Sequence, residues 1–354
     1  MAYTTINKSS DYFNTKLYTG DNTNDRQISL DWSPDLTWIK ARNVAYGHEW
    51  YDRVRGIGKD LSSSTTSAEG TNRHGWTNSG CTTDSFTVDR GSNETLNESG
   101  RPMVAWNWLA NGTGSANTAG SINSTVSANT TAGFSIVSWT GNNSGSATVG
   151  HGLGAVPNVV IIKKRDGTTN WGFKHSSFAS GAMAVLNTTD APSNRNGSTN
   201  GGIGDLTSST TFGFIGGGAG TPSENNGSMI AYCFAEKQGF SKFGSYTGNG
   251  NTSGTFCYTG MKPSFIIVKR TDATSNWRMW DNKRNTFNVV NKALLPNDSS
   301  AEQENSNQSI DFLSNGFKLR AGYADTNASG GTYIYMAFAE APLVGTNNVP
   351  TTAR

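Results

Sequence analysis

Two stretches of the chain are near copies of each other: AVPNVVIIKKRDGTTNW (residues 155–171) and GMKPSFIIVKRTDATSNW (residues 260–277). In each, a proline precedes a run of aliphatic residues that ends in basic residues, a polar turn and a tryptophan. A continuous apolar run of this length favours a strand that is buried on both faces. A proline fits the entry of such a strand, where a missing N–H costs little. The two stretches therefore predict the same buried strand at two places in the chain.

The similarity extends to both sides of these stretches. Downstream, SMIAYCFAE (228–236) matches YIYMAFAE (333–340). Upstream, GFSIVSWTGN (133–142) matches GFSKFGSYTGN (239–249) with one residue of slippage. The repeated unit is too long for a solenoid repeat and has the size of one small β domain.

A third, more diverged copy precedes the other two. Its segments are DYFNTKLYTGD (11–21), SPDLTWIKAR (33–42), HEWYD (48–52) and MVAWNWLAN (103–111). This alignment places Trp50, Trp171 and Trp277 at one position, and Tyr18, Trp139 and Tyr246 at another. Because these aromatic residues recur in every unit, we expect them to lie in the core or between sheets.

The composition favours strands and turns over helices. Charged residues make up 15% of the chain, against about 25% in a typical soluble protein, and Asn, Ser, Thr and Gly replace them. We therefore expect an all-β protein of three tandem β-sandwich or jelly-roll-like repeats. The predicted organisation is a diverged first repeat and candidate anchor (1–112), a Gly/Ser/Thr/Asn-rich linker or edge strand (113–132), a second repeat (133–238), a third repeat (239–343) and a C-terminal arm (344–354).

Several classes of protein are disfavoured. The net charge is +2 and the basic residues are scattered, which argues against a nucleic-acid partner. No stretch approaches the roughly 20 apolar residues of a membrane helix, and the N-terminus lacks the apolar segment of a secretory signal. Cys81, Cys233 and Cys257 form neither a disulfide framework nor a zinc-binding pattern. We expect no membrane partner, no cofactor, no metal, and synthesis in a cytoplasm.

No catalytic motif stands out in the sequence. The histidines, at positions 48, 74, 151 and 175, lie in no HExxH spacing, and there is no GxSxG elbow. Acid pairs such as Glu49 with Asp52, or Asp281 with Glu302, are the type of group that a glycosidase uses. Such pairs occur in any chain with 26 acidic residues, so we predict that the protein is not an enzyme.

Aromatic residues without counterparts in the other units are candidates for sugar-binding platforms. Trp280, Trp76 and Tyr323 belong to this group, and Arg278, Asp281 and Asn282 surround Trp280 in the sequence. Aromatic rings stack on sugar rings, and amide, carboxylate and guanidinium groups bond to sugar hydroxyls. The alternative is a solvated loop with one buried tryptophan.

Four segments carry a resemblance to a known family. INKSSDYFNTKLYTGD (6–21), STVSANTTAGFSIVSWTGN (124–142), VGHGLGAVPNVVIIKKRDGTTNW (149–171) and QSIDFLSNGFKLR (308–320) resemble a repeated domain of virion proteins of tailed bacteriophages, many of them marine. The resemblance implies a structural, tail-fibre-like protein with lectin-like sandwich domains, and implies no catalytic residues. The chain departs from typical fibres because it has no coiled-coil or shaft-like segment.

The resemblance leads to three functional hypotheses. The first is a tail fibre or tail-tip protein on the virion surface, a homotrimer that contacts other virion proteins and binds host surface polysaccharide. The second is a capsid-decorating protein on the phage head. The third, and weakest, is a glycan-cleaving depolymerase.

Overall fold

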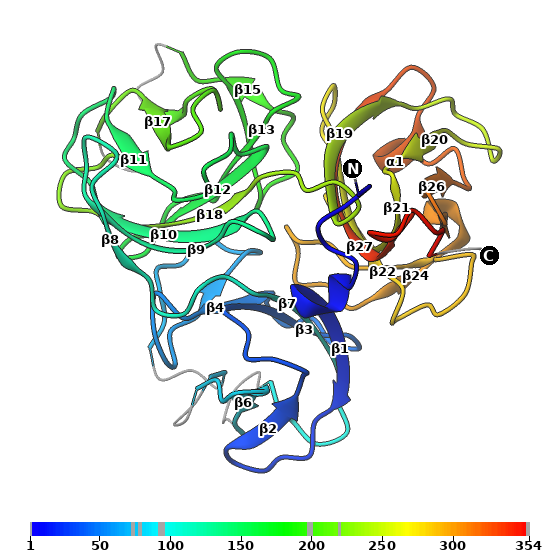
Figure 1. The fold of residues 1–354 in the computed structure, drawn as a ribbon. Coiled ribbons are helices and arrows are strands. Elements are labelled where there is room, and N and C mark those ends of the chain that lie inside the picture. Colours follow the sequence, from blue (N-terminus) through cyan, green and yellow to red (C-terminus); the bar gives the residue numbers. More distant parts are fainter. Residues whose placement is uncertain are drawn as a thin grey trace.

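The protein is all-β and is built from antiparallel sheets, as the composition predicted. The computed structural model describes residues 2–71, 75–76, 80–90, 96–196, 201–218 and 221–351. Figure 1 shows three lobes around a common centre, which we call the N-terminal lobe (residues 13–108), the middle lobe (115–234) and the C-terminal lobe (241–342). Within the described ranges no helix is long and apolar enough to cross a membrane.

The N-terminal lobe contains a large sheet of order β1–β7–β3–β4–β5 and a small sheet, β2–β6. Its strands are β1 (Phe13–Thr19), β2 (Arg26–Ser29), β3 (Leu36–Ala41), β4 (Glu49–Asp52), β5 (Leu61–Ser62), β6 (Ser85–Val88) and β7 (Pro102–Trp108). A short 3₁₀ helix, η1 (Ser9–Asp11), precedes β1.

The middle lobe has a large sheet of order β15–β14–β13–β12–β18–β10–β9–β8 and a small sheet, β11–β17–β16. Its strands are β8 (Ser115–Asn117), β9 (Ser124–Asn129), β10 (Phe134–Thr140), β11 (Thr148–Gly150), β12 (Val159–Lys164), β13 (Gly172–His175), β14 (Ala182–Val185), β15 (Ser193–Asn194), β16 (Gly202–Ile203), β17 (Thr211–Ile215) and β18 (Ser228–Phe234). The segment 113–132 therefore supplies two strands: β9 pairs with β10, and β8 pairs with β9 and forms the edge of the large sheet.

The C-terminal lobe has a large sheet of order β19–β27–β21–β22, a small sheet of order β20–β26–β25, and the pair β23–β24. Its strands are β19 (Ser241–Thr247), β20 (Phe256–Tyr258), β21 (Met261–Arg270), β22 (Arg278–Asp281), β23 (Lys292–Ala293), β24 (Gln303–Glu304), β25 (Ile310–Leu313), β26 (Gly316–Leu319) and β27 (Thr332–Pro342). The helices are η2 (Ser306–Gln308) and α1 (Ala324–Asn327).

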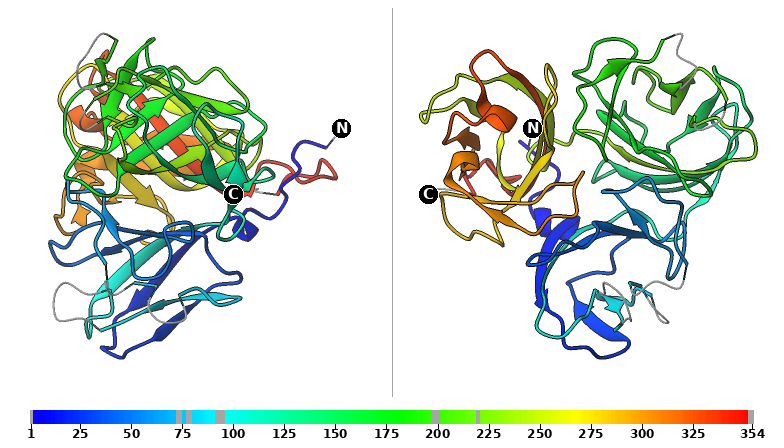
Figure 2. Two further views of the ribbon diagram at one scale, coloured as in Figure 1. Left: turned by 90° about the vertical axis from the view of Figure 1, so that its left-hand side faces the viewer. Right: turned by 180° about the vertical axis from the view of Figure 1, so that it is seen from behind.

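Each of the three large sheets contains four neighbouring strands in the same order of connection: β1–β7–β3–β4, β10–β18–β12–β13 and β19–β27–β21–β22. In each lobe the small sheet packs on one face of the large sheet and encloses a hydrophobic core of its own. The other faces of the three large sheets meet in a fourth core at the centre of the molecule. Figure 2 shows the lobes grouped around this centre from two further directions.

Strand β12 shows why the apolar run is continuous. Val160 and Ile162 face the core of the middle lobe, whereas Val159 and Ile161 face the central core. Both faces are thus removed from water, and polar residues at alternate positions would be buried without partners.

Three aromatic rings meet at the middle of the central core, one from each lobe. Trp108, Phe234 and Phe338 have ring centroids 5.6–6.2 Å apart, and each side chain is almost fully buried. The three residues pair with Leu36, Val159 and Phe265 in their own sheets, so they occupy the same place in the strand register. The lobes are therefore held together by a shared aromatic core.

Backbone carbonyl groups of one lobe accept hydrogen bonds from indoles of the next. Trp171 Nε1 donates to the carbonyl oxygen of Ser62 (2.9 Å), and Trp277 Nε1 donates to that of Val185 (3.1 Å). The strand register places His48, not Trp50, where these tryptophans stand, and the His48 ring faces the backbone of Leu295. The predicted equivalence of Trp50 with Trp171 and Trp277 is wrong by two residues, because local similarity of HEWYD to the other copies misaligned the strand.

Three buried lysines lie where the lobes meet. Lys163 donates to the carbonyl oxygens of Thr66 (2.9 Å) and Thr169 (2.8 Å), and Lys269 to those of Thr189 (2.8 Å) and Ser275 (2.5 Å). Lys163 and Lys269 therefore each link a carbonyl group of their own lobe to a carbonyl group of the preceding lobe. Lys40, at the same register position, donates to carbonyl groups of its own lobe, and burial lowers the pKa of all three amines to about 8.

The central histidines make stability depend on pH. Burial lowers the pKa of His175 to about 4 from an ordinary 6.5, and lowers that of His48 strongly. An unfolded chain takes up protons near pH 6.5 while the folded chain does not, so the free energy of unfolding falls as the pH drops below 6.5. The expected slope is up to roughly 1.4 kcal/mol per pH unit for each histidine.

Urea denaturation at pH 7, 6 and 5 measures this slope, and His175→Gln is expected to reduce it. An equal slope in the variant and the parent protein would contradict a role for His175.

Candidate functional site

The structure buries most of the side chains predicted to bind sugars. Trp280 and Asp281 are 0% exposed, Arg278 is 3% exposed and Trp76 is 2% exposed, whereas Asn282 and Tyr323 are partly buried. Trp280 lies in the core of the C-terminal lobe and Trp76 in the core of the N-terminal lobe. A buried ring has no free face for a sugar, so the prediction that Trp280 and Trp76 form surface platforms is corrected here.

Only two of these residues form a close pair, and their contacts are internal. The guanidinium group of Arg278 lies 5.0 Å from the ring centroid of Tyr323. It also donates to Asp325 (2.7 and 3.0 Å) and to Gln303 (3.1 Å), and it bonds to Gln308. Arg278 therefore lies in the interior of the C-terminal lobe, where Asp325 neutralises its charge and its N–H groups have hydrogen-bond acceptors.

Three of the four carboxylates considered for catalysis, those of Asp52, Asp281 and Glu302, are bound in ion pairs. Asp281 Oδ2 lies 2.5 Å from Arg284 Nε, and Glu302 binds both Arg284 (3.2 Å) and Arg42 (2.8 Å). Burial alone would raise the pKa of Glu302, but the hydrogen bonds and charges of Arg42 and Arg284 outweigh it and lower the pKa. Asp52 pairs with buried Arg55 in the same way. These carboxylates link parts of the structure together.

Exposed aromatic side chains occur elsewhere in the C-terminal lobe. Phe287 is 78% exposed and lies beside a groove that Asn282 and Lys283 also line. Phe256 and Tyr258 are exposed on β20. These residues could not be identified from the sequence, because an aromatic residue in a short polar segment has the same sequence pattern whether its ring is buried or exposed.

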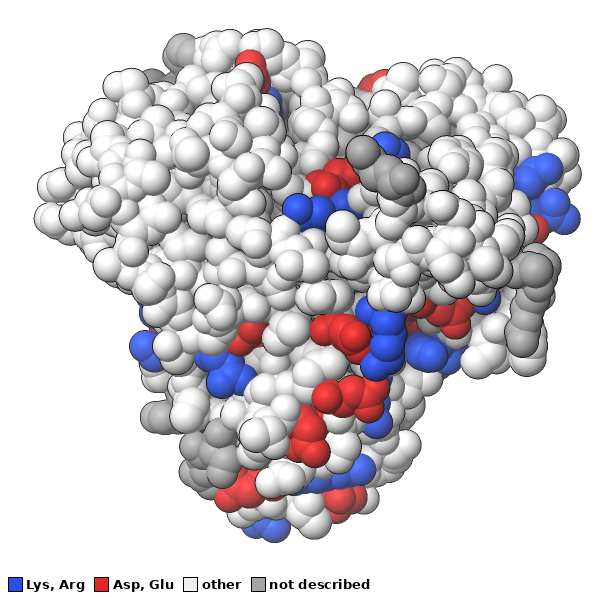
Figure 3. Space-filling model, in the orientation of Figure 1, with Lys and Arg blue, Asp and Glu red and all other residues white. Residues whose placement is uncertain are grey.

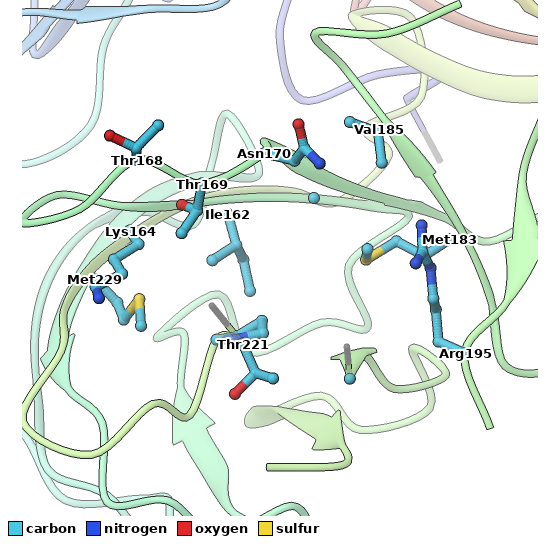
Figure 4. A pocket seen from close by; sticks show the side chains of 13 residues that line it. Ile162, Lys164, Thr168, Thr169, Asn170, Met183, Val185, Arg195, Thr221 and Met229 are labelled. Atoms are coloured by element: carbon cyan, nitrogen blue, oxygen red, sulfur yellow. The ribbon is translucent and has the colours of Figure 1, made fainter. Parts of the chain in front are cut away.

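A pocket opens in the middle lobe, lined by strands β12, β13, β14 and β18 of the large sheet and by the segments that connect the strands. Its volume is about 290 Å³, near the lower end of the range for small-molecule sites. Figure 4 shows Ile162 and Thr169 projecting into it from one side, Thr221 from the opposite side, and Met183 with Arg195 at one end. Lys164 and Met229 lie at the other end.

Gly172 explains why the middle lobe has this space. Gly172 pairs with Ile162 on β12, and Arg278 pairs with Val268 on β21, at the same place in the two sheets. A Cβ added to Gly172 would lie 3.2 Å from Met183 Sδ and 3.5 Å from Ile203 Cδ1. The pocket thus occupies interior volume into which the C-terminal lobe projects a long side chain.

Arg195 brings a guanidinium group to the pocket from the segment after β15. Its Nε is buried without a hydrogen-bond partner, and among the described residues its side chain makes no hydrogen bond or ion pair. The other cation of the pocket is engaged, because Lys164 Nζ lies 2.6 Å from Glu224 Oε1 and 3.8 Å from Asp166 Oδ1. Arg195 is therefore the charged group of the pocket that is free to meet a ligand.

One face of the middle lobe is poor in charge. In Figure 3 acidic and basic side chains gather over the N-terminal lobe and the junction with the C-terminal lobe, whereas the visible face of the middle lobe is almost entirely uncharged.

The histidines show no metal site. Leu153 N donates to Nδ1 of His151 (3.2 Å), and Ser177 N donates to Nδ1 of His175 (3.0 Å). His74 lies outside the described residues. No group of three or more metal-ligating side chains occurs in the part of the chain that the structure describes.

The pocket was missed at the level of sequence, although a signal for it was present. One copy has Asn170-Trp171-Gly172 and the other has Asn276-Trp277-Arg278, so a glycine in one copy is aligned with a large charged residue in the other. Such a difference between copies marks a place where one copy has space that the other fills.

These features define an all-β protein of several antiparallel sheets with a pocket in its middle lobe. The chain belongs to the family described as a domain of unknown function, DUF7483, whose model matches residues 8–342. The match spans all three lobes, so the family is defined on the three-lobed body and not on a single lobe. Comparison with curated proteins and comparison with solved structures each give no match.

Proposed function

We propose that the three lobes are tandem β-sandwich repeats of one ancestral unit, closed into a single body. The common strand order, the register of the aromatic triangle and the recurring buried lysines support this proposal. The extensive central core implies that the repeats depend on one another for burial of their apolar faces.

We further propose that this body is a structural protein on the virion surface of a tailed bacteriophage, a tail fibre or tail-tip component that binds host surface glycan. The single observation that carries the proposal is the shared aromatic core, because it makes three sandwiches into one rigid scaffold with fixed surfaces. The sequence resemblance gives the setting, and the uncharged face and pocket of the middle lobe offer surfaces for sugar. Many copies on one particle would convert weak contacts into firm attachment.

Localisation in the intact particle tests this role. Cryo-electron microscopy of virions is expected to show the three-lobed body at the tail, and antibody against it is expected to block adsorption to the host. Density confined to other parts of the particle, with unchanged adsorption, would refute the tail assignment.

A capsid-decorating role is the second candidate. It is favoured by the compact body, since the described residues contain no shaft-like or coiled-coil region. Three lobes about one centre would also suit a threefold position on a lattice. Hundreds of copies on the head, removable without loss of the tail, would establish this alternative.

We propose the N-terminal lobe as the anchor to other virion proteins, because it is the most diverged repeat. Removing the lobe would strip the central core of Trp50, Trp106 and Trp108, so deletion would report on folding and not on attachment. Charge-reversing substitutions on its exposed surface, followed by a virion incorporation assay, separate the two effects.

Light scattering of the purified protein tests the proposed homotrimer.

A further inference from the structure

We propose that the pocket of the middle lobe binds one acidic sugar residue, a uronic acid or a sulfated monosaccharide unit, through a salt bridge to Arg195. This inference rests on the proposed glycan-binding function and assigns it a site and a ligand class. In the C-terminal lobe the same interior space is filled by a charge pair of the protein itself, Arg278 with Asp325.

In the C-terminal lobe the interior guanidinium group has an internal carboxylate. Arg278 donates to Asp325 through two nitrogens, at 2.7 and 3.0 Å. Asp325 immediately precedes Thr326 in helix α1, and the carbonyl oxygen of Thr326 accepts a hydrogen bond from the hydroxyl group of Tyr246. That bond holds α1 against the large sheet and keeps the Asp325 carboxylate beside Arg278.

In the middle lobe the corresponding loop carries no carboxylate at this place. Trp139 occupies the register position of Tyr246, and its indole donates to the carbonyl oxygen of Pro222 (3.1 Å). The residue before this carbonyl is Thr221, where the C-terminal lobe has Asp325. Thr221 lines the pocket, and its hydroxyl group donates to the carbonyl oxygen of Gly218 (2.8 Å).

The middle lobe therefore presents a guanidinium group without the carboxylate that satisfies its counterpart. Gly172 vacates the space of the Arg278 side chain, and Arg195 enters from another segment with its Nε buried and unpaired. A buried donor without an acceptor is unfavourable, and a planar guanidinium group best matches a carboxylate, sulfate or phosphate group. An anionic group of a ligand would stand where Asp325 stands in the other lobe.

The remaining lining favours a sugar ring. Ile162, Met183 and Met229 provide apolar surface for the ring carbons, while the Thr169 and Thr221 side chains contribute hydroxyl groups. A volume of about 290 Å³ is small for a site, which restricts the occupant to a single ring. The rest of a polysaccharide would continue outside the pocket.

Titration of the full chain with monosaccharides tests the proposal. Saturable shifts in protein NMR spectra, or heats in calorimetry, are expected with glucuronate, galacturonate or a galactose sulfate, and none with galactose or glucose. The separate uronate and sulfate arms identify the anionic group. Binding of acetate and inorganic sulfate as tightly as the acidic sugars would overturn the assignment of a sugar site.

Two variants link the binding to Arg195. Arg195→Gln removes the charge and is expected to lower affinity at least tenfold without lowering the melting temperature. Thr221→Asp supplies the carboxylate that the C-terminal lobe has, and is expected to raise the melting temperature and also lower affinity at least tenfold. Arg101→Gln, at a partly exposed arginine in the N-terminal lobe, is the control and is expected to leave affinity unchanged.

Absence of binding by any acidic sugar, or binding that survives Arg195→Gln, would overturn the inference. These outcomes are separate from failure of the proposed function. If the protein lies on the tail and antibody against it blocks adsorption, but it binds no acidic sugar, only this site is refuted. If it binds acidic sugars but is absent from virions, only the virion role is refuted.

Discussion

Trp108→Ala is expected to lower the free energy of unfolding by about 3–5 kcal/mol, the usual range for loss of a large aromatic side chain from a core. Trp108 is 2% exposed and contacts rings from both other lobes. Its indole Nε1 has no hydrogen-bond partner, so the loss is one of packing and apolar burial. Chemical denaturation followed by circular dichroism measures the change.

The same substitution is expected to loosen all three lobes together. Phe234 of the middle lobe and Phe338 of the C-terminal lobe lose a packing partner, and a cavity opens between the large sheets. Hydrogen exchange should therefore rise in strands β7, β18 and β27. Trp139→Ala is the matched control, because Trp139 packs on Phe212 and Phe214 within the middle lobe alone.

Faster exchange confined to the N-terminal lobe in the Trp108 variant would contradict a shared core. It would mean that each lobe is stable by itself and that the central contacts add little.

Asp281→Ala is expected to cost about 3–5 kcal/mol, the range for removing one partner of a buried ion pair. Asp281 and Arg284 have fully buried side chains, with Asp281 Oδ2 2.5 Å from Arg284 Nε. Asp281 Oδ2 also accepts the indole N–H of Trp106 from the N-terminal lobe (3.1 Å). In the variant the buried guanidinium group of Arg284 keeps only Glu302 as an ion-pair partner, and the hydrogen bond from Trp106 to Asp281 between the two lobes is lost.

The charge pair forms part of a chain that crosses the boundary between lobes. Arg284 also binds Glu302, and Glu302 binds Arg42 of the N-terminal lobe. A parallel chain runs from Asp52 through Arg55 and Glu69 to Arg165 of the middle lobe. At the third boundary, between the middle and C-terminal lobes, the register places His175 where these chains have Asp52 and Asp281.

Two comparisons make this prediction specific. Asp11→Ala removes the exposed ion pair between Asp11 and Lys8, whose side chains are 48% and 64% exposed, and is expected to leave the stability almost unchanged, because water and salt screen exposed charges. The double variant Asp281→Leu with Arg284→Met removes both buried charges and is expected to recover part of the loss. A double variant as unstable as the sum of the singles would contradict the charge-burial explanation.

Local sequence patterns were enough to predict the strands of the repeated stretches. The apolar run of residues 159–162 lies in β12 with both faces buried, and the matching run of residues 265–268 lies in β21. Tyr18, Trp139 and Tyr246 are buried, as expected for residues that recur in each copy. These results depend on side-chain alternation and on turn residues, which act over a few positions of the chain.

The partners of the buried faces were outside the reach of such patterns. An alternating or continuous apolar run shows that a face is buried but not what covers it. Trp106 and Asp281, or Tyr232 and Asp52, are far apart in the chain and meet only because the lobes close around one centre. For the same reason the sequence could not tell that Trp280 and Trp76 are interior side chains.

The all-β class and the positions of the repeated strands could be predicted from the amino-acid sequence, because both follow from local hydrophobic periodicity and turn chemistry. The three-dimensional structure was needed to show that the three large sheets share a core, that His48 takes the place of a tryptophan, and that Gly172 and Arg195 form a pocket. Those features depend on which surfaces remain uncovered after each sheet has formed, and the free energy of covering them is gained only between segments that are distant in the chain.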